Sequence, residues 1–189
     1  MNVYGSRQDY KGAYISVIMK MLDLIDMGRS PEIQGTGNES YDFVYVEDCA
    51  KANILAMKSN KKNIFLNVGT GKRTSLKKLA ETILQLKKVK NKIKYIKSKN
   101  KTIVKNRIGS TKKAKKEIKY EFSVNLKEGL RKTIEWKDKL DTWIESVVES
   151  PKKADDKNSY NLENKCHMMV ENGYIRHQII IHEHQNPDP

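Results

Sequence analysis

Cysteine is scarce in this sequence, and long hydrophobic runs are missing. The 189 residues contain two cysteines, Cys49 and Cys166, and no Cys-x-x-Cys pair, which excludes a disulfide framework and is typical of a protein from a reducing cytoplasm. The longest apolar runs, such as Ile179–Ile181, are far too short to cross a bilayer, and the first residues carry no basic-then-apolar leader. We therefore expect a cytoplasmic protein with no membrane partner.

Acidic residues are almost missing from one third of the chain. Residues 61–120 contain 21 lysines and arginines but only two acids, so this block carries +19 while the whole chain carries +14. Such a block can indicate nucleic-acid binding. However, few aromatic residues there could stack on bases, and no arginine cluster offers forked contacts. Biased composition is the favoured interpretation, and nucleic acid is not the expected partner.

Helical and strand periodicities alternate over residues 2–136, which predicts an α/β fold. Asp48 could cap or start one of the helices, whose buried face would include Ala52 and Ile54. In the segment 92–97, Ile93 and Tyr95 alternate with lysines, so we expect a strand with one buried edge. The expected strands are 32–34, 43–46, 64–68 and 92–97, and the expected helices are 13–27, 48–57, 76–86 after a Thr74 or Ser75 cap, 111–118 and 125–143.

Six short motifs follow one another in a characteristic order. They are Asn2-Val-Tyr-Gly-Ser-Arg-Gln-Asp, Gly12-Ala-Tyr-Ile-Ser-Val-Ile, Asp42-Phe-Val-Tyr-Val-Glu-Asp-Cys-Ala-Lys-Ala-Asn, Asn67-Val-Gly-Thr-Gly, Asn106-Arg-Ile-Gly and Asn125-Leu-Lys-Glu-Gly-Leu-Arg-Lys-Thr-Ile-Glu-Trp. The ordered set resembles the NAD-dependent sugar-nucleotide epimerases and dehydratases, which are extended short-chain dehydrogenases similar to UDP-glucose 4-epimerase. The first motif resembles the segment just after the family's catalytic Tyr-x-x-x-Lys. The resemblance implies the C-terminal, substrate-binding portion of a Rossmann-like α/β fold, from an enzyme of surface-polysaccharide precursor synthesis.

The resemblance also implies a binding site for a nucleotide-diphosphate sugar. Asn2 matches an asparagine that hydrogen-bonds the diphosphate, and Arg107 matches an arginine that clamps it. Val17 and Ile18 match the stretch along the uracil ring, and Phe43 lies in the strand that lines the nucleotide. A forked, permanent cation with neutral donors beside it suits a diphosphate.

Two positions depart from the family pattern. Tyr41 stands where the family usually has an arginine, and Gln34 stands where it usually has an aromatic residue. One diphosphate cation and one base-stacking ring are therefore absent, although the Tyr41 hydroxyl could still donate a hydrogen bond. Asn67 has a competing interpretation, because an asparagine after a strand often only caps a turn.

Residues for the family's hydride-transfer chemistry are missing from the sequence. That chemistry uses NAD, a Gly-rich loop that meets its pyrophosphate, and a tyrosine base with a lysine nearby. No Gly-x-x-Gly-x-x-Gly occurs, Tyr10-x-x-x-Tyr14 lacks the lysine, and Tyr160 is followed by Lys165 one position too late. We therefore expect no catalytic or cofactor-binding residue in this chain, and no activity from the chain alone.

Three functions from different classes stay open. The first is a fragment of a nucleotide-sugar epimerase or dehydratase, and the second is a basic, non-enzymatic nucleic-acid-binding module. The third is a subunit that complements a separately encoded cofactor half; a homodimer partner is a further alternative.

The domain boundary is predicted at residue 149, between a substrate-binding part, 1–148, and a linker with an unassigned tail, 149–189. The dipeptide Asn172-Gly173 predicts a hairpin in the tail. Cys166 and all four histidines also lie there, but their spacing favours incidental residues over a metal site. The histidines are His167, His177, His182 and His184.

Overall fold

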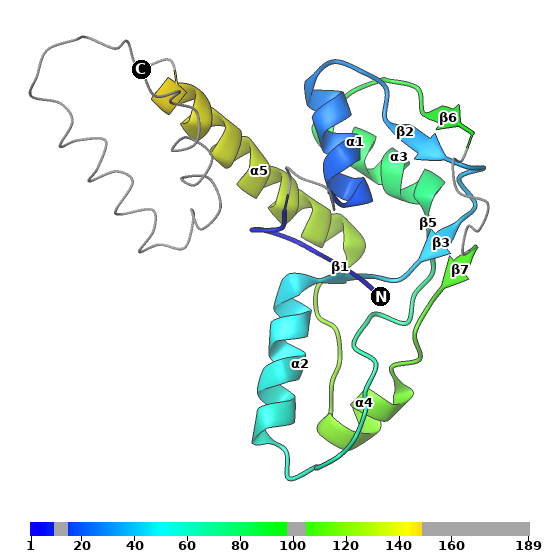
Figure 1. Ribbon diagram of the computed structural model, residues 1–189, viewed down its shortest axis with the longest axis vertical. Helices are drawn as coiled ribbons and strands as arrows, with labels where there is room; N and C mark the ends of the chain where they lie inside the picture. The colour runs from blue at the N-terminus through cyan, green and yellow to red at the C-terminus, as the bar shows by residue number, and fades with distance from the viewer. Residues whose placement is uncertain (10–14, 98–104, 149–189) are drawn as a thin grey trace, which may run out of the picture. The chain divides into compact units, whose positions relative to one another are not determined.

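Helices and strands alternate along the chain in the computed structural model, which describes residues 1–9, 15–97 and 105–148. In chain order the elements are β1 (Asn2–Tyr4), α1 (Val17–Asp26), β2 (Glu32–Gln34), β3 (Ser40–Tyr41), β4 (Phe43–Tyr45), α2 (Val46–Lys58), β5 (Thr74–Ser75), α3 (Leu76–Lys87), β6 (Lys94–Ile96), β7 (Asn106–Arg107), α4 (Lys112–Ile118) and α5 (Leu126–Val148) (Figure 1). The predicted α/β pattern is present.

The chain divides into two compact units, Met1–Trp143 and Ile144–Pro189. Within the described residues, the first unit holds every strand, α1 to α4 and most of α5, and the second holds the end of α5. The linker, the Asn172-Gly173 hairpin, Cys166 and the four histidines lie outside the described residues. The boundary expected at residue 149 stays a prediction.

The strands form three small sheets. β1 pairs in parallel with β4, with Asn2 opposite Phe43. β2 pairs in parallel with β6. In the third sheet β3 lies between β5 and β7, so that Tyr41 is opposite Thr74 on one side and Arg107 on the other. The third sheet thus joins three segments that are far apart in the sequence.

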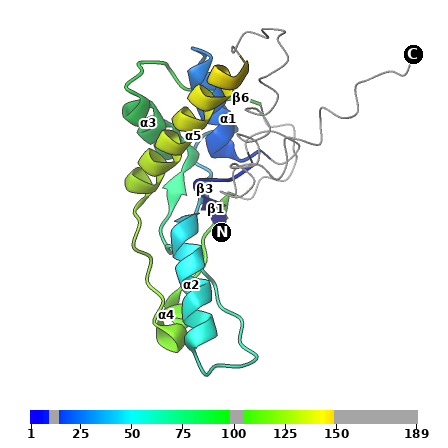
Figure 2. The ribbon, with the colours of Figure 1, turned by 90° about the vertical axis from the view of Figure 1, so that its left-hand side faces the viewer.

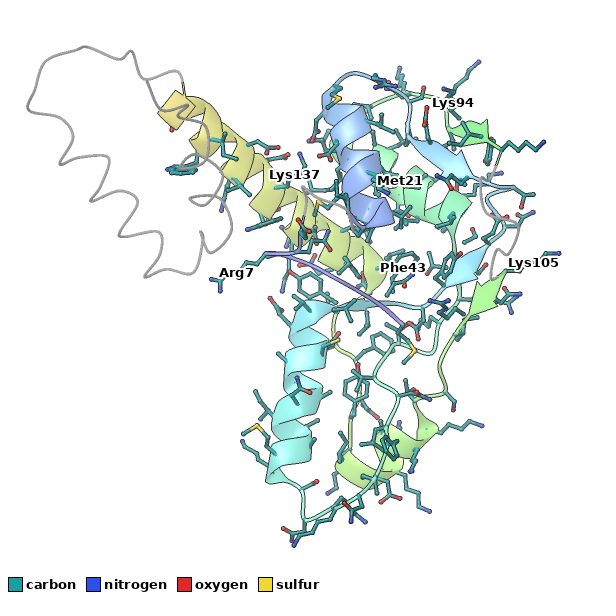
Figure 3. All side chains as sticks on the ribbon, in the orientation of Figure 1. Arg7, Met21, Phe43, Lys94, Lys105 and Lys137 are labelled. Atoms are coloured by element: carbon teal, nitrogen blue, oxygen red, sulfur yellow. The ribbon has the colours of Figure 1, made fainter. Side chains whose placement is uncertain are left out.

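Helix α1 supplies much of the main hydrophobic core. It begins at Val17, later than the predicted start at 13, because the Ser16 side chain accepts the N–H of Met19 at 3.3 Å and caps the helix there. The buried side chains of α1 pack with those of α3 and with Phe43 (Figure 3). The cap predicted for α3 is confirmed, since the Ser75 hydroxyl accepts the N–H of Lys78 at 3.1 Å. None of the described helices combines the length and apolarity that crossing a membrane requires.

Helix α2 differs from its prediction in two respects. It begins at Val46, and Asp48 is fully buried inside its first turn instead of capping it. The predicted apolar face is only partly buried: Ala52 packs in a second small core with α4, but Ile54 is 51% exposed. Helices α2 and α4 lie side by side in two perpendicular views (Figures 1 and 2).

Two other expectations about strands are wrong. Residues 64–68 form no strand, and Phe65 is 93% exposed. A strand requires a neighbouring strand to accept its N–H groups, and within the described residues no strand pairs with this segment. Tyr95 in β6, expected on the buried edge, is 47% exposed.

Candidate functional site

A buried aspartate, Asp42, connects three segments of the chain. Its carboxylate accepts the N–H and hydroxyl of Thr70, at 3.0 and 2.6 Å, and the N–H of Gly71 at 2.9 Å. Its backbone carbonyl accepts the N–H of Asn2 at 2.8 Å, and its own N–H donates to the carbonyl of Arg107 at 3.0 Å. One residue therefore holds β1, β7 and the loop after Asn67 together.

Close packing at two glycines draws the same segments together. A Cβ on Gly69 would lie 2.6 Å from an Asp42 carboxylate oxygen and 2.8 Å from Met1 Cγ. A Cβ on Gly109, the residue two positions after Arg107, would lie 2.5 Å from Met1 Sδ. Gly69 therefore requires glycine, because the buried Asp42 carboxylate is held by its hydrogen bonds, whereas the flexible end of Met1 can shift away from a side chain at position 109.

The structure brings together three of the five residues predicted to bind substrate. Asn2 lies opposite Phe43 in the β1–β4 pair, and the backbones of Asn2 and Arg107 both bond to Asp42. The Arg107 side chain is exposed. Within the described residues it makes no ion pair, so its guanidinium can receive an anion.

A row of polar side chains crosses the third sheet beside Arg107. Residues opposite one another on neighbouring strands share a face of the sheet. The register therefore puts Arg107, Tyr41 and Thr74 on one face. The Tyr41 ring also packs edge-to-face on Phe43, with centroids 6.3 Å apart. A guanidinium and two hydroxyl groups consequently share one surface next to the core.

The other two predicted residues lie at the start of α1. Ile18 is 1% exposed and packs in the main core, and Val17 is half-buried against that core. Phe43 belongs to the same core. The Ile18 side chain is used for packing, so of these two residues Val17 is the better placed to meet a ligand.

The turn after β2 is closed by Glu39. Its carboxylate accepts the N–H of Thr36 at 3.1 Å and the N–H of Gly37 at 2.8 Å. Burial would raise the pKa of Glu39, but these hydrogen bonds outweigh it and lower the pKa. Gln34, just before this turn, is exposed.

A second buried aspartate supports the site from the α2 side. The Asp48 carboxylate accepts the N–H and hydroxyl of Ser123, at 2.8 and 2.7 Å, and the N–H of Val124 at 3.1 Å. The Tyr120 hydroxyl donates to the carbonyl of Gly69 at 3.1 Å, and its pKa is raised by burial and by the charge of Asp48. Tyr120 therefore acts as a neutral donor that holds the loop beside Asp42.

Sequence reasoning missed the roles of Asp42, Asp48 and Tyr120. The sequence shows an acidic residue inside an apolar segment, as in Asp42-Phe-Val-Tyr. This pattern does not show which hydrogen-bond donors the carboxylate meets in the fold. The Asn67 side-chain amide donates to the carbonyl of Ser110 at 3.4 Å, a bond that joins two distant segments instead of capping the local turn.

Two further expectations concern metal binding and the positive charge of residues 61–120. Among the described residues, no group of three or more His, Cys, Asp or Glu side chains is placed to hold a metal ion. Part of the positive charge is neutralised locally, as in the ion pairs Lys61–Glu117 at 2.9 Å and Lys94–Glu32 at 2.8 Å.

Known proteins of one family are similar to this chain. Residues 1–69 match the NAD dependent epimerase/dehydratase family. A relative from Methanocaldococcus jannaschii, named as a UDP-glucose 4-epimerase, is 38% identical over 135 residues, which are 71% of this chain and 43% of the relative.

Two solved structures resemble the chain in fold as well as in sequence. The UDP-glucose 4-epimerase of Thermotoga maritima, solved with UDP-glucose, is 33% identical with a TM-score of 0.69. The UDP-N-acetylglucosamine 4-epimerase of Methanobrevibacter ruminantium, in complex with UDP-N-acetylmuramic acid, is 32% identical with a TM-score of 0.68. Each comparison covers 74% of this chain and 44% of the neighbour, so the chain spans less than half the length of these relatives. About three quarters of this chain is therefore a segment of the NAD-dependent epimerase/dehydratase fold, as its motifs predict.

Proposed function

We propose that this segment provides the binding surface for a nucleotide-diphosphate sugar in an NAD-dependent epimerase or dehydratase. The observation that carries the proposal is a pair of backbone hydrogen bonds: the N–H of Asn2 donates to the carbonyl of Asp42 at 2.8 Å, and the N–H of Asp42 donates to the carbonyl of Arg107 at 3.0 Å. These bonds hold the backbones of Asn2 and Arg107 to the same residue although 105 positions separate them in the sequence.

The chemistry of the surface suits a diphosphate. The guanidinium of Arg107 supplies a permanent charge and forked donors. The register puts Tyr41 between Thr74 and Arg107, at the position where the family usually has a second cation. Val17, which is half-buried, provides apolar surface for the base, and the buried Phe43 supports it from the core. The two solved neighbours carry UDP-glucose and UDP-N-acetylmuramic acid by name, which supports a UDP-sugar as the ligand class.

The described residues do not fit the family's cofactor. A dinucleotide pyrophosphate binds where glycines let it approach the first turn of a helix. Here α1 and α3 are preceded by Ser16 and Ser75, whose hydroxyls already accept a helix N–H, and α2 is preceded by Tyr45 instead of glycine. We therefore assign no chemical step to NAD in this chain.

The 189-residue chain, purified alone, is expected neither to bind NAD nor to interconvert UDP-sugars, because the residues for hydride transfer are absent. Calorimetric titration with NAD and a chromatographic assay of UDP-glucose and UDP-galactose would test this. NAD-dependent epimerisation above background by the isolated chain would contradict it.

Arg107→Ala is expected to weaken UDP-glucose binding by about 1.5–3 kcal/mol, the range for a hydrogen bond to a charged group, or roughly 10- to 150-fold. Asn2→Ala should cost less, about 0.5–1.5 kcal/mol, because it removes one neutral donor. Calorimetry, or ligand-observed NMR if binding is weak, measures both.

Lys90→Ala is the matched control, because it removes one exposed positive charge outside β3, β5 and β7. If Arg107→Ala binds UDP-glucose as well as Lys90→Ala does, and both remain folded, Arg107 is not in the site. That result would remove the main support for the proposed function.

A further inference from the structure

Helix α4 presents lysines wherever it does not face the small core. Its Ala114 and Ile118 are buried in that core together with Tyr120. Glu117 is the only acidic residue of the helix. The exposed residues of α4 are Lys112, Lys113, Lys115 and Lys116.

The segment after α2 joins this lysine face. The Lys61 ammonium lies 2.9 Å from the Glu117 carboxylate of α4. Five positions later, Leu66 packs against the same small core as Ala114. Residues 61–66 are therefore held beside α4 at both ends, and Lys62 adds a further exposed positive charge there.

Most of the positive charge on this surface is unpaired. Five lysines of α4 and of residues 61–66 stand near the single Glu117 carboxylate, and in the described part of the chain only Lys61 among them forms an ion pair. The five are Lys61, Lys62, Lys112, Lys113 and Lys116. Such a cluster produces a positive potential that attracts anions.

An exposed aromatic side chain lies in the same surface. Phe65 is 93% exposed, although Lys61 and Leu66 on either side of it contact α4. A single exposed apolar residue is ordinary by itself. Surrounded by unpaired lysines, however, a phenylalanine completes the pair of groups that attaches proteins to a bilayer surface: cations for anionic headgroups and an apolar group that inserts.

We propose that this basic surface, made of α4 and residues 61–66, binds a membrane that contains anionic lipids, with the Phe65 ring inserted at the level of the headgroups. The proposal goes beyond the proposed function, because neither Asn2 nor Arg107 takes part in it. It replaces the expectation of no membrane partner, which depended on the lack of a segment long enough to cross a bilayer. Attachment to a membrane surface does not require such a segment.

A nucleic acid fits this surface less well. Proteins that bind single strands use several aromatic rings for stacking. Near α4, Tyr120 is buried, and Phe122 is half-buried with the Lys72 ammonium 4.8 Å from its ring centroid. The basic surface also contains no arginine, whose forked donors suit individual phosphates. Lysine ammonium groups act as point charges, which suits a layer of mobile headgroups.

Vesicle sedimentation tests the proposal with the whole 189-residue chain. We expect the chain to sediment with vesicles of equimolar phosphatidylcholine and phosphatidylglycerol, but not with vesicles of phosphatidylcholine alone. Phe65→Ser should weaken the partitioning by about tenfold, because the apolar insertion is lost. The triple variant Lys112→Gln, Lys113→Gln, Lys116→Gln should weaken it by about a hundredfold, since each lysine near an anionic membrane contributes roughly fivefold.

A second triple variant, Lys20→Gln, Lys90→Gln, Lys139→Gln, is the matched control. It removes the same number of exposed charges outside the basic surface, and it should weaken partitioning by no more than about threefold, because salt screens distant charges. Phe65→Trp should restore the partitioning that Phe65→Ser loses, since tryptophan also suits the headgroup region. Thermal unfolding checks that all variants are folded.

Three outcomes would overturn the proposal. The anionic vesicles could fail to sediment the unsubstituted chain. The two triple variants could partition equally, which would show that only the net charge matters, or Phe65→Ser could partition like the unsubstituted chain. Finally, a single-stranded oligonucleotide could bind more tightly than the anionic vesicles and depend on Phe65, in which case the surface belongs to a nucleic acid.

Discussion

Asp42→Ala is expected to lower the free energy of unfolding by about 3–4 kcal/mol, because about 1–3 kcal/mol is lost for each buried donor left without a partner. The carboxylate is fully buried and is the acceptor for the Thr70 hydroxyl and for the N–H groups of Thr70 and Gly71. Thr70 and Gly71 can be partly rehydrated, which keeps the expected loss below the sum for three donors. Urea unfolding followed by circular dichroism measures the change.

Thr70→Val provides a graded control for Asp42→Ala. It removes the hydroxyl donor, whose hydrogen bond to Asp42 is 2.6 Å, but keeps the backbone donors. The expected loss is about 1 kcal/mol. If Asp42→Ala is no more destabilising than Thr70→Val, the Asp42 carboxylate does not organise the loop, and the geometry proposed for Asn2 and Arg107 loses its basis.

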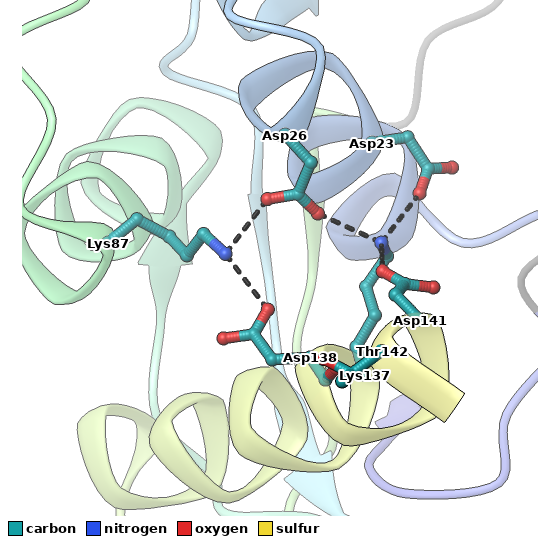
Figure 4. Close-up of polar contacts among 7 residues, drawn as sticks. All are labelled: Asp23, Asp26, Lys87, Lys137, Asp138, Asp141 and Thr142. Atoms are coloured by element: carbon teal, nitrogen blue, oxygen red, sulfur yellow. Dashed lines mark hydrogen bonds and ion pairs between the residues drawn. The ribbon is translucent and has the colours of Figure 1, made fainter. Parts of the chain in front are cut away.

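Lys137→Met is expected to lower the free energy of unfolding by about 3 kcal/mol, the lower end for breaking a buried ion pair. The Lys137 side chain is 5% exposed and connects α5 to α1, with its ammonium 3.3 Å from Asp23, 2.9 Å from Asp26 and 2.6 Å from Asp141 (Figure 4). The three carboxylates are partly solvated, so water compensates part of the loss.

The same cluster predicts how stability depends on pH. Burial would raise the pKa of Asp26, but Lys137 and Lys87 outweigh it and lower that pKa. The stabilisation from Asp26 is therefore present above its ordinary pKa near 4 and is lost as the pH falls through the lowered pKa. Burial would lower the pKa of Lys87, but Asp26 and Asp138 raise it, so its stabilisation is present below about 10.4 and is lost as the pH rises through the raised pKa.

Urea unfolding from about pH 2 to about pH 12 tests this prediction. Lys137→Met should be less stable than the unsubstituted chain at pH 7, and its stability should decrease less steeply below pH 4. Lys139→Met, at an exposed position on the same helix, should change stability by no more than about 0.5 kcal/mol. Equal effects of the two substitutions would show that the cluster does not stabilise the fold.

The motifs and periodicities of the sequence were sufficient to predict the resemblance to the family and most of the helices. Their signals lie in short stretches of sequence. Each of the six motifs, the apolar spacing of α1 and the Ser75 cap of α3 depends on residues that are neighbours in the chain. The α/β pattern follows from the same periodicities.

Only the tertiary structure decided which distant residues meet. Residues 64–68 have the composition of a strand, but a strand also needs a partner, and no described strand pairs with them. Asp48 has the chemistry of a helix cap, but its buried carboxylate instead accepts the N–H groups of Ser123 and Val124, which lie 75 and 76 positions away in the sequence. Likewise, no local pattern shows that Asp42 joins Asn2 to Arg107, since hydrogen bonds between strands depend on how the chain returns to the same place.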